Sequence, residues 1–218
     1  MRSLRLGPAE VRFTGREEGD VSQHAGVARG ARQRAVVDRP WKTARQVHGS
    51  RAVFVDSSTG DVGDADALVT TYRTIAIAVH TADCAPVALA GGDVAAVAHA
   101  GWRGLEAGVL DETVELMRAK GATAIEAALG PCIQPSCYEF GADDLERLVD
   151  RFGDSVRSTT SEGTPALDVP AAVRTSLERL DVVLVHDVGT CTACEPDEWF
   201  SHRARQEPER QATVVWLP

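Results

Sequence analysis

Short runs of apolar and β-branched residues recur along the chain, and this recurrence restricts its fold more than any other feature. Gly, Asp or Pro residues flank the runs, as is typical of strand ends. We therefore predict strands at residues 52–55, 75–80, 87–90, 94–98, 127–129, 182–185 and 213–217.

Between these runs, apolar residues recur at helical spacing. The clearest helix is predicted at 105–119, with Gly121 suited to its carboxyl end. A second follows from the i, i+3, i+4, i+7 repeat that begins at Leu145, and a third begins after Asp168, a good N-cap residue, with Pro170 in its first turn. Strands and helices without strict β-α-β alternation indicate an α+β, or mixed α/β, fold.

Composition limits the organisation and the partners. The 218 residues contain no repeat or long linker, so we expect one domain over residues 1–218, with 1–40 irregular and a loop at 15–34. A net charge of −9 disfavours nucleic acid and anionic membranes as partners. Without a bilayer-spanning run or a signal peptide, and with only five cysteines, the chain is expected in the reducing cytoplasm. It carries no signal for an oligomeric state.

The most informative segment is residues 81–104, TADCAPVALAGGDVAAVAHAGWRG. Two apolar runs flank Gly91-Gly92-Asp93, which predicts a β-hairpin. A two-residue loop at Gly91-Gly92 would place Cys84 opposite His99, close enough to share a metal ion or to form a thiolate–imidazole pair. A three-residue loop would place His99 opposite Ala85, on the other face.

His48, in RQVHG before the strand at 52–55, is a third candidate ligand. Together with Cys84 and His99 it would give a three-ligand site with an open fourth position, the pattern of catalytic zinc. An exposed loop histidine is the alternative interpretation of His48.

The segment after His99, AGWRG, leads from a strand directly into a helix. Gly101 and Gly104 allow a tight turn, and the first N–H groups of the helix would form an anion site beside Arg103. A plain strand-to-helix turn with an exposed arginine is the alternative. Asp83 would orient a ligand, hold a substrate hydroxyl or cap a turn.

The remaining cysteines give weaker signals. Cys191 and Cys194 have C-x-x-C spacing, but a zinc ribbon needs two such pairs, so we interpret them as packed thiols, with a redox pair as the alternative. Cys132 and Cys137 lie in a Gly- and Pro-containing rigid loop. Three further histidines are assigned no functional role: His24, His80 and His186.

Six motifs occur in the order typical of one known family: RQVHG, GDADALVTT, TADCAPVALA, AVAHAGWRG, LGPCIQPSCYEFG and CTACEPDEWFSHR. From about residue 41 to 217 the chain resembles the laccase-domain, polyphenol-oxidase-like proteins. These are described as purine nucleoside phosphorylases with adenosine deaminase activity and, in bacteria, as peptidoglycan editing factors. The resemblance implies a layered αββα domain similar to the cytotoxic-necrotising-factor type of cysteine hydrolase. It also implies zinc, or copper, on His48, Cys84 and His99.

The shared motifs imply further site residues. Asp83 and Arg103 would act beside the three ligands in catalysis. The substrate-binding residues implied by the motifs are Gln46, Asp66, Arg103, Gly104, Cys137 and Arg203. The chain departs from the family in an abbreviated, irregular GDVSQHAGVARG segment, in Ser136 where some members have cysteine, and in His202 where the usual SYRR has tyrosine.

The resemblance, together with these residues, implies three enzymatic functions, and a non-enzymatic, zinc-holding interaction module is a further alternative. The first is a zinc-dependent purine nucleoside enzyme that phosphorolyses adenosine, inosine or methylthioadenosine and deaminates adenosine, with nucleoside and phosphate as its small-molecule partners. The second is a cysteine hydrolase or amidase for a peptidoglycan precursor, with Cys84 as nucleophile and His99 as base. A copper-dependent polyphenol oxidase is disfavoured, because several copper ions need more imidazoles than six histidines supply.

Overall fold

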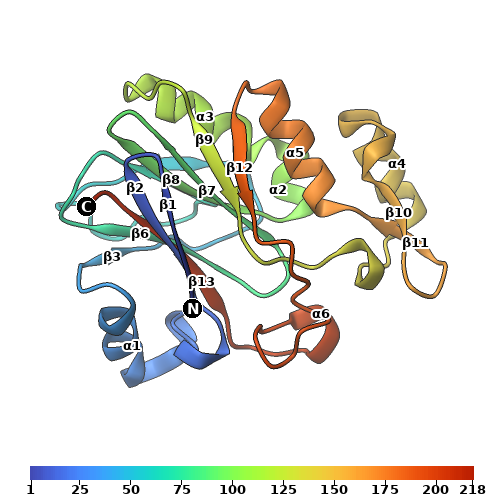
Figure 1. The fold of residues 1–218 in the computed structure, drawn as a ribbon, viewed down its shortest axis with the longest axis horizontal. Helices are drawn as coiled ribbons and strands as arrows, with labels where there is room; N and C mark the ends of the chain where they lie inside the picture. The colour runs from blue at the N-terminus through green and yellow to red at the C-terminus, as the bar shows by residue number, and fades with distance from the viewer.

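The computed structural model describes the backbone of residues 1–218 and the side chains of all but residues 23 and 24, so His24 lies outside the described side chains. Two β-sheets lie face to face, and helices cover the outer side of each, which gives an αββα layering (Figure 1). The first sheet has the order β1 (Arg2–Leu6), β2 (Ala9–Phe13), β13 (Gln211–Trp216), β6 (Ala76–Thr81) and β3 (Trp41–Lys42). The second has the order β12 (Val183–Asp187), β9 (Glu126–Leu129), β7 (Ala85–Gly91), β8 (Val94–Ala100), β5 (Ala67–Thr70) and β4 (Ala52–Phe54).

Both sheets contain parallel and antiparallel pairs, which confirms the mixed fold class. The helices are α1 (Arg29–Val36), α2 (Trp102–Ala107), α3 (Val109–Ala119), α4 (Ala142–Phe152), α5 (Val169–Arg179) and α6 (His202–Arg205). The smaller elements are η1 (Arg16–Glu18), η2 (Gln23–Ala28), η3 (Pro135–Cys137), η4 (Asp154–Val156) and the hairpin of β10 (Arg157–Thr159) and β11 (Pro165–Leu167). Within the part of the chain that the structure describes, none of the helices combines the length and apolarity that a membrane crossing requires.

Side chains alternate between the two faces of the central strands, which builds two apolar layers. On β8, Ala96 and Ala98 face α3 and α5, whereas Ala95 and Val97 face the first sheet. The first layer is therefore closed by helices and the second by the other sheet, as expected when side chains alternate across a strand. The small alanine side chains let the layers approach closely. His99 lies two residues after Val97 on the same strand, so its side chain also faces the space between the sheets.

The seven predicted strands are all present, and so are the helices that contain Leu145 and follow Asp168. The Asp168 carboxylate accepts a hydrogen bond of 2.7 Å from the Ala171 N–H, as an N-cap should. The single helix predicted at 105–119 is wrong. Gly108, with a φ of 93°, separates α2 from α3, because glycine readily adopts this left-handed conformation.

The prediction that residues 1–40 are irregular is also wrong. Strands β1 and β2 form an antiparallel hairpin whose inner residues, among them Leu6, Val11 and Phe13, are buried between the sheets. The loop predicted at 15–34 contains 3-10 turns and the start of α1, and Val36 at the end of that helix packs on the outer face of the first sheet. Charged residues between the apolar ones concealed an alternating pattern that is typical of a strand with one buried face.

Candidate metal centre and its cavity

The candidate ligands meet where the chain crosses from one sheet to the other. Strand β6 belongs to the first sheet and β7 to the second, so residues 82–84 span the gap between them. Cys84 is half-buried at the end of this crossing. His99, near the end of β8, is buried, whereas His48 lies on an exposed loop before β4.

The β7–β8 hairpin is present, but its predicted register is wrong. The two loop residues are Gly92 and Asp93, so Gly91 pairs with Val94, and Pro86 rather than Cys84 lies opposite His99. Glycine at position 92 allows the φ of 58° found there. The error amounts to two residues, and a shift of two keeps every side chain on its face of the sheet. Cys84 therefore still lies on the side of the hairpin that His99 occupies.

The three predicted ligands do converge. One ligand atom from each of His48, Cys84 and His99 lies within 4.8 Å of the others, and the Cys84 Sγ is 3.8 Å from the His48 Nε2. The two imidazole rings meet edge to face with centroids 4.7 Å apart. Gly101 makes this approach possible, because a Cβ there would lie 2.9 Å from the His48 ring and 3.2 Å from the Cys84 sulfur.

Asp66 positions both histidines. Its buried carboxylate accepts hydrogen bonds from the backbone N–H groups of Val47, His48 and Gly49, which holds the His48 loop although His48 itself has a φ of 60°. The same carboxylate accepts the Nδ1–H of His99 at 2.8 Å. A carboxylate partner on Nδ1 fixes the tautomer of His99 and leaves Nε2 as the ligating nitrogen, an arrangement common at metal sites.

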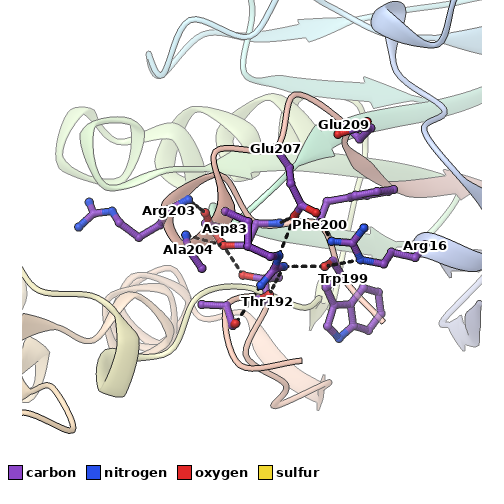
Figure 2. Close-up of polar contacts among 12 residues, drawn as sticks. Arg16, Asp83, Thr192, Trp199, Phe200, Arg203, Ala204, Glu207 and Glu209 are labelled. Carbon is purple, nitrogen blue, oxygen red and sulfur yellow. Dashed lines mark hydrogen bonds and ion pairs between the residues drawn. The ribbon is translucent and has the colours of Figure 1, made fainter. Parts of the chain in front are cut away.

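Asp83 anchors the carboxyl-terminal segment beside Cys84. Its carboxylate accepts hydrogen bonds from the hydroxyls of Thr192 and Ser201, both 2.7 Å, and from the backbone N–H of Arg203, 2.6 Å (Figure 2). These bonds hold Asp83 at a φ of 105°, which is unusual for a residue other than glycine. The structure thus gives this side chain a positioning role, while its substrate contact stays a prediction.

The local charges favour a thiolate. Burial raises the pKa of the Cys84 thiol, but the neighbouring His99 and His48 outweigh it and lower the pKa to about 6. Burial lowers the pKa of His99, but Cys84 and Asp66 outweigh it and raise the pKa to about 9. Burial also opposes ionisation of Asp66, yet the bonds from His99 and the backbone N–H groups keep the pKa of its carboxyl below the ordinary value. Without metal, the centre is a thiolate–imidazolium pair supported by a carboxylate.

The donor set fits a metal ion. One thiolate and two imidazoles are ligands that zinc and copper both accept. A nitrogen and a sulfur bound to one tetrahedral zinc ion at about 2.0 and 2.3 Å would stand about 3.5 Å apart. The 3.8 Å between the Cys84 sulfur and the His48 Nε2 is close to that separation. All three residues adjoin a cavity.

That cavity has a volume of about 450 Å³ and is lined by all three candidate ligands. Four arginines contribute to its wall although the chain as a whole is acidic: Arg29, Arg45, Arg203 and Arg210. The Arg203 guanidinium donates to the Glu139 carbonyl and stacks on Tyr138. A cavity of this size and charge suits a small organic anion.

The other predicted site residues divide into two groups. Gln46 lines the cavity, and its amide exchanges two hydrogen bonds of 2.8 Å with the backbone of His80. The cavity-lining residues in the described part of the chain do not include Asp66, Gly104, Arg103 or Cys137, so the substrate contacts of these four stay predictions. Gly104 packs against the Gly49 carbonyl, since a Cβ would lie 3.0 Å from that oxygen.

Arg103 and Cys137 have other neighbours. Arg103 is exposed and stacks on Trp102. The anion site expected beside Arg103 thus stays a prediction. Cys137 lies near Cys191 and Cys194.

Several cavity residues had no sequence signal. Arg29 begins α1 and Arg210 directly precedes β13, so only the folded chain brings these two arginines to one cavity. His80, to which the sequence assigned no functional role, also lines the cavity. His202 could have been found, because it replaces the tyrosine of the SYRR pattern in a motif already singled out.

Two stacked mixed sheets with helices outside define a layered α/β protein, and a His–Cys–His group at the crossing between the sheets gives it a candidate mononuclear centre. The chain belongs to the family described as multi-copper polyphenol oxidoreductase laccase, whose model matches residues 13–218. This confirms the resemblance carried by the six motifs.

Relatives agree in name and in fold. The chain is 42% identical over 180 residues to a purine nucleoside phosphorylase of Streptomyces coelicolor, covering 79% of this chain and 73% of the relative. A purine nucleoside phosphorylase of Xylella fastidiosa is 36% identical over 184 residues, with 79% and 70% covered. The crystal structure of a Neisseria meningitidis protein of the DUF152 family is similar, with a TM-score of 0.87, 29% identity, and 100% of this chain and 99% of that chain covered.

Proposed function

We propose that this chain is a zinc-dependent purine nucleoside phosphorylase. The observation that carries the proposal is the convergence of His48, Cys84 and His99 on the wall of an arginine-lined cavity of about 450 Å³. The names of the relatives support the reaction class. Adenosine, inosine and methylthioadenosine are the proposed substrates, and hydrolytic deamination of adenosine is a proposed second activity. All five cysteines are unpaired, in keeping with a cytoplasmic location.

The proposed roles follow from where the side chains lie. A bound zinc ion would polarise an oxygen, either of phosphate or of water. The Arg203 and Arg210 guanidiniums would hold the phosphate by charge-assisted hydrogen bonds. Asp66 keeps the Nε2 of His99 directed at the centre, and Asp83 keeps the segment that carries Arg203 against the cavity.

The test is a product assay on protein whose metal content has been measured. Zinc-loaded protein is incubated with inosine, adenosine or methylthioadenosine, with and without phosphate, and the products are separated by chromatography. Phosphate-dependent release of the free base and a ribose phosphate is the expected result, whereas inosine formed from adenosine without phosphate reports deamination. Loaded protein that forms none of these products would refute the proposal. Parallel loading with copper identifies which metal supports activity.

A second candidate function rests on a specific observation. Cys84, His99 and Asp66 form a thiol–imidazole–carboxylate series with a lowered thiol pKa, an arrangement that supports nucleophilic catalysis. In that case Cys84 would attack an amide carbonyl of a peptidoglycan precursor, and His99 would supply the proton to the leaving group. Metal and substrate would compete for one sulfur atom. Amide hydrolysis by metal-free protein, lost on alkylation of Cys84, would support this alternative.

A further inference from the structure

A second group of three sulfurs lies outside the cavity. The Sγ atoms of Cys137, Cys191 and Cys194 are all within 4.8 Å of one another, and those of Cys137 and Cys194 are 2.8 Å apart. We infer that these three cysteines form a second metal site, selective for a soft ion such as Zn²⁺ and separate from the His48–Cys84–His99 centre.

The fold brings the three thiols together from distant parts of the sequence. Cys137 ends the 3-10 helix η3, and Cys191 begins a turn that carries Cys194 three residues later. An isolated parallel bridge joins Cys191 to Cys132, in which the Thr192 N–H donates to the Cys132 carbonyl at 3.2 Å. This bridge fixes the turn beside η3. The C-x-x-C pair, which alone lacked enough ligands for a structural zinc site, thus gains a third.

Hydrogen-bond donors face two of the three sulfurs. The Gln134 N–H donates to the Cys191 Sγ at 3.4 Å, and the Ser136 hydroxyl donates to the Cys137 Sγ at 3.8 Å. Such bonds stabilise the charge of a thiolate. Ser136, at a position where some family members have cysteine, therefore supports the site instead of supplying a ligand.

Arg205 holds the turn that carries Cys191 and Cys194. The Arg205 guanidinium donates to the carbonyls of Thr192, Ala193 and Trp199, at 3.1, 3.0 and 2.8 Å. The ligand turn is therefore positioned before any ion arrives. Cys191 is buried and Cys194 is exposed, so an ion could enter on the Cys194 side, where water would complete its coordination.

The chemistry of the ligands selects the ion. Three thiolates bind zinc or copper(I) and not calcium or magnesium, which prefer oxygen. Two thiolates on one tetrahedral zinc ion, each at about 2.3 Å, stand about 3.8 Å apart. On loading, the Cys137 and Cys194 sulfurs must therefore separate by about 1 Å. The exposure of Cys194 leaves that side chain free to rotate.

An ion at this site would also act on the cavity. Thr192 lies inside the ligand turn, and its hydroxyl donates to Asp83, the neighbour of Cys84. Asp83 in turn accepts the backbone N–H of Arg203, which lines the cavity (Figure 2). Binding at the three cysteines would therefore stabilise the segment that shapes the cavity, without contact with substrate.

The test removes the sulfur ligand of the first centre, so that sulfur-to-metal absorption reports the second site alone. C84S protein, kept reduced, is loaded with Zn²⁺ or Co²⁺, dialysed and analysed for metal and for visible absorption. We expect about one ion per chain, with intense sulfur-to-cobalt charge-transfer absorption that Cys84 can no longer supply. C84S/C194S should lose both signals, whereas C84S/C132A, the matched control that removes a buried thiol outside the group, should keep them.

A second measurement uses the wild-type chain and does not depend on the variants. Zinc should protect Cys137, Cys191 and Cys194 from alkylation, as mapped by mass spectrometry. The inference is overturned if reduced C84S binds no zinc or cobalt, or if zinc leaves the alkylation of the three thiols unchanged. A Cys137–Cys194 disulfide that forms readily in air and persists with zinc present would also overturn it, by identifying the pair as a redox site. None of these outcomes depends on phosphorylase activity.

Discussion

Replacing Asp66 by asparagine tests how the centre is held together. Asparagine has the shape of aspartate but replaces one carboxylate oxygen by an NH₂ group. One Asp66 oxygen accepts from the His48 N–H and the His99 Nδ1–H, and the other accepts from Val47 and Gly49. The asparagine oxygen can serve only one of these two sets, so the NH₂ group must face N–H donors.

The expected loss follows from the bonds that disappear. At least two charge-assisted hydrogen bonds of a carboxylate are lost, each contributing about 1.5–3 kcal/mol. Asp66 is only 1% exposed, so water cannot replace them. After some relaxation of the His48 loop, we expect D66N to lower the free energy of unfolding by about 3 kcal/mol. Metal affinity should fall by about 10- to 100-fold, because the orientation of both histidines depends on this carboxylate.

Two assays separate these effects. Denaturant unfolding of metal-free protein measures the stability, and competition with a chromophoric chelator measures the affinity for zinc. D64N is the matched control, because Asp64 is only partly buried and pairs with the exposed Arg45, where an ion pair contributes about 0–1 kcal/mol. Equal stability and zinc affinity in D66N and D64N would refute the positioning role of Asp66.

Three further predictions concern the centre and its cavity. G101A should stay folded, because the backbone conformation at this position suits alanine (φ −70°, ψ 159°). Its zinc affinity, measured by calorimetric titration, should fall at least about tenfold, because the added methyl group would lie 2.9 Å from the His48 ring. In metal-free protein, the rate of Cys84 alkylation by iodoacetamide should reach half of its maximum near pH 6 and not near pH 9. The rate should fall as the pH is lowered, because protons convert the reactive thiolate to the thiol. R203Q should raise the KM for phosphate about tenfold or more, whereas R147Q, an exposed arginine outside the cavity, should leave it unchanged in steady-state kinetics.

Two of the three ligands could be paired from the sequence because their pattern is local, whereas His48 was a separate loop candidate that the family resemblance joined to them. The β7–β8 hairpin brings Cys84 and His99 together from one continuous segment, and an error of two residues in its register preserved the face on which both lie. The break at Gly108 was not predicted, because apolar residues continue through it and conceal the change of helix direction. The β1–β2 hairpin was missed for a similar reason, since arginine and glutamate alternate with its buried residues.

The supporting contacts could not be predicted, because tertiary structure creates them. Asp83 meets Thr192 and Ser201 across more than a hundred residues, and Arg29 reaches the same cavity as Arg210. Nothing in the local sequence distinguishes these side chains from surface arginines or turn-capping aspartates. Cys137 likewise joined Cys191 and Cys194 only when the fold placed η3 beside their turn.

Anomalous diffraction at the zinc absorption edge, from crystals of zinc-loaded protein, tests the central claim most directly. The account predicts a peak about 2.0–2.1 Å from the ligating nitrogens of His48 and His99 and about 2.3 Å from the Cys84 sulfur, with its remaining coordination position open to the cavity. Protein that catalyses phosphorolysis while its crystals show no anomalous peak among these three side chains would contradict it.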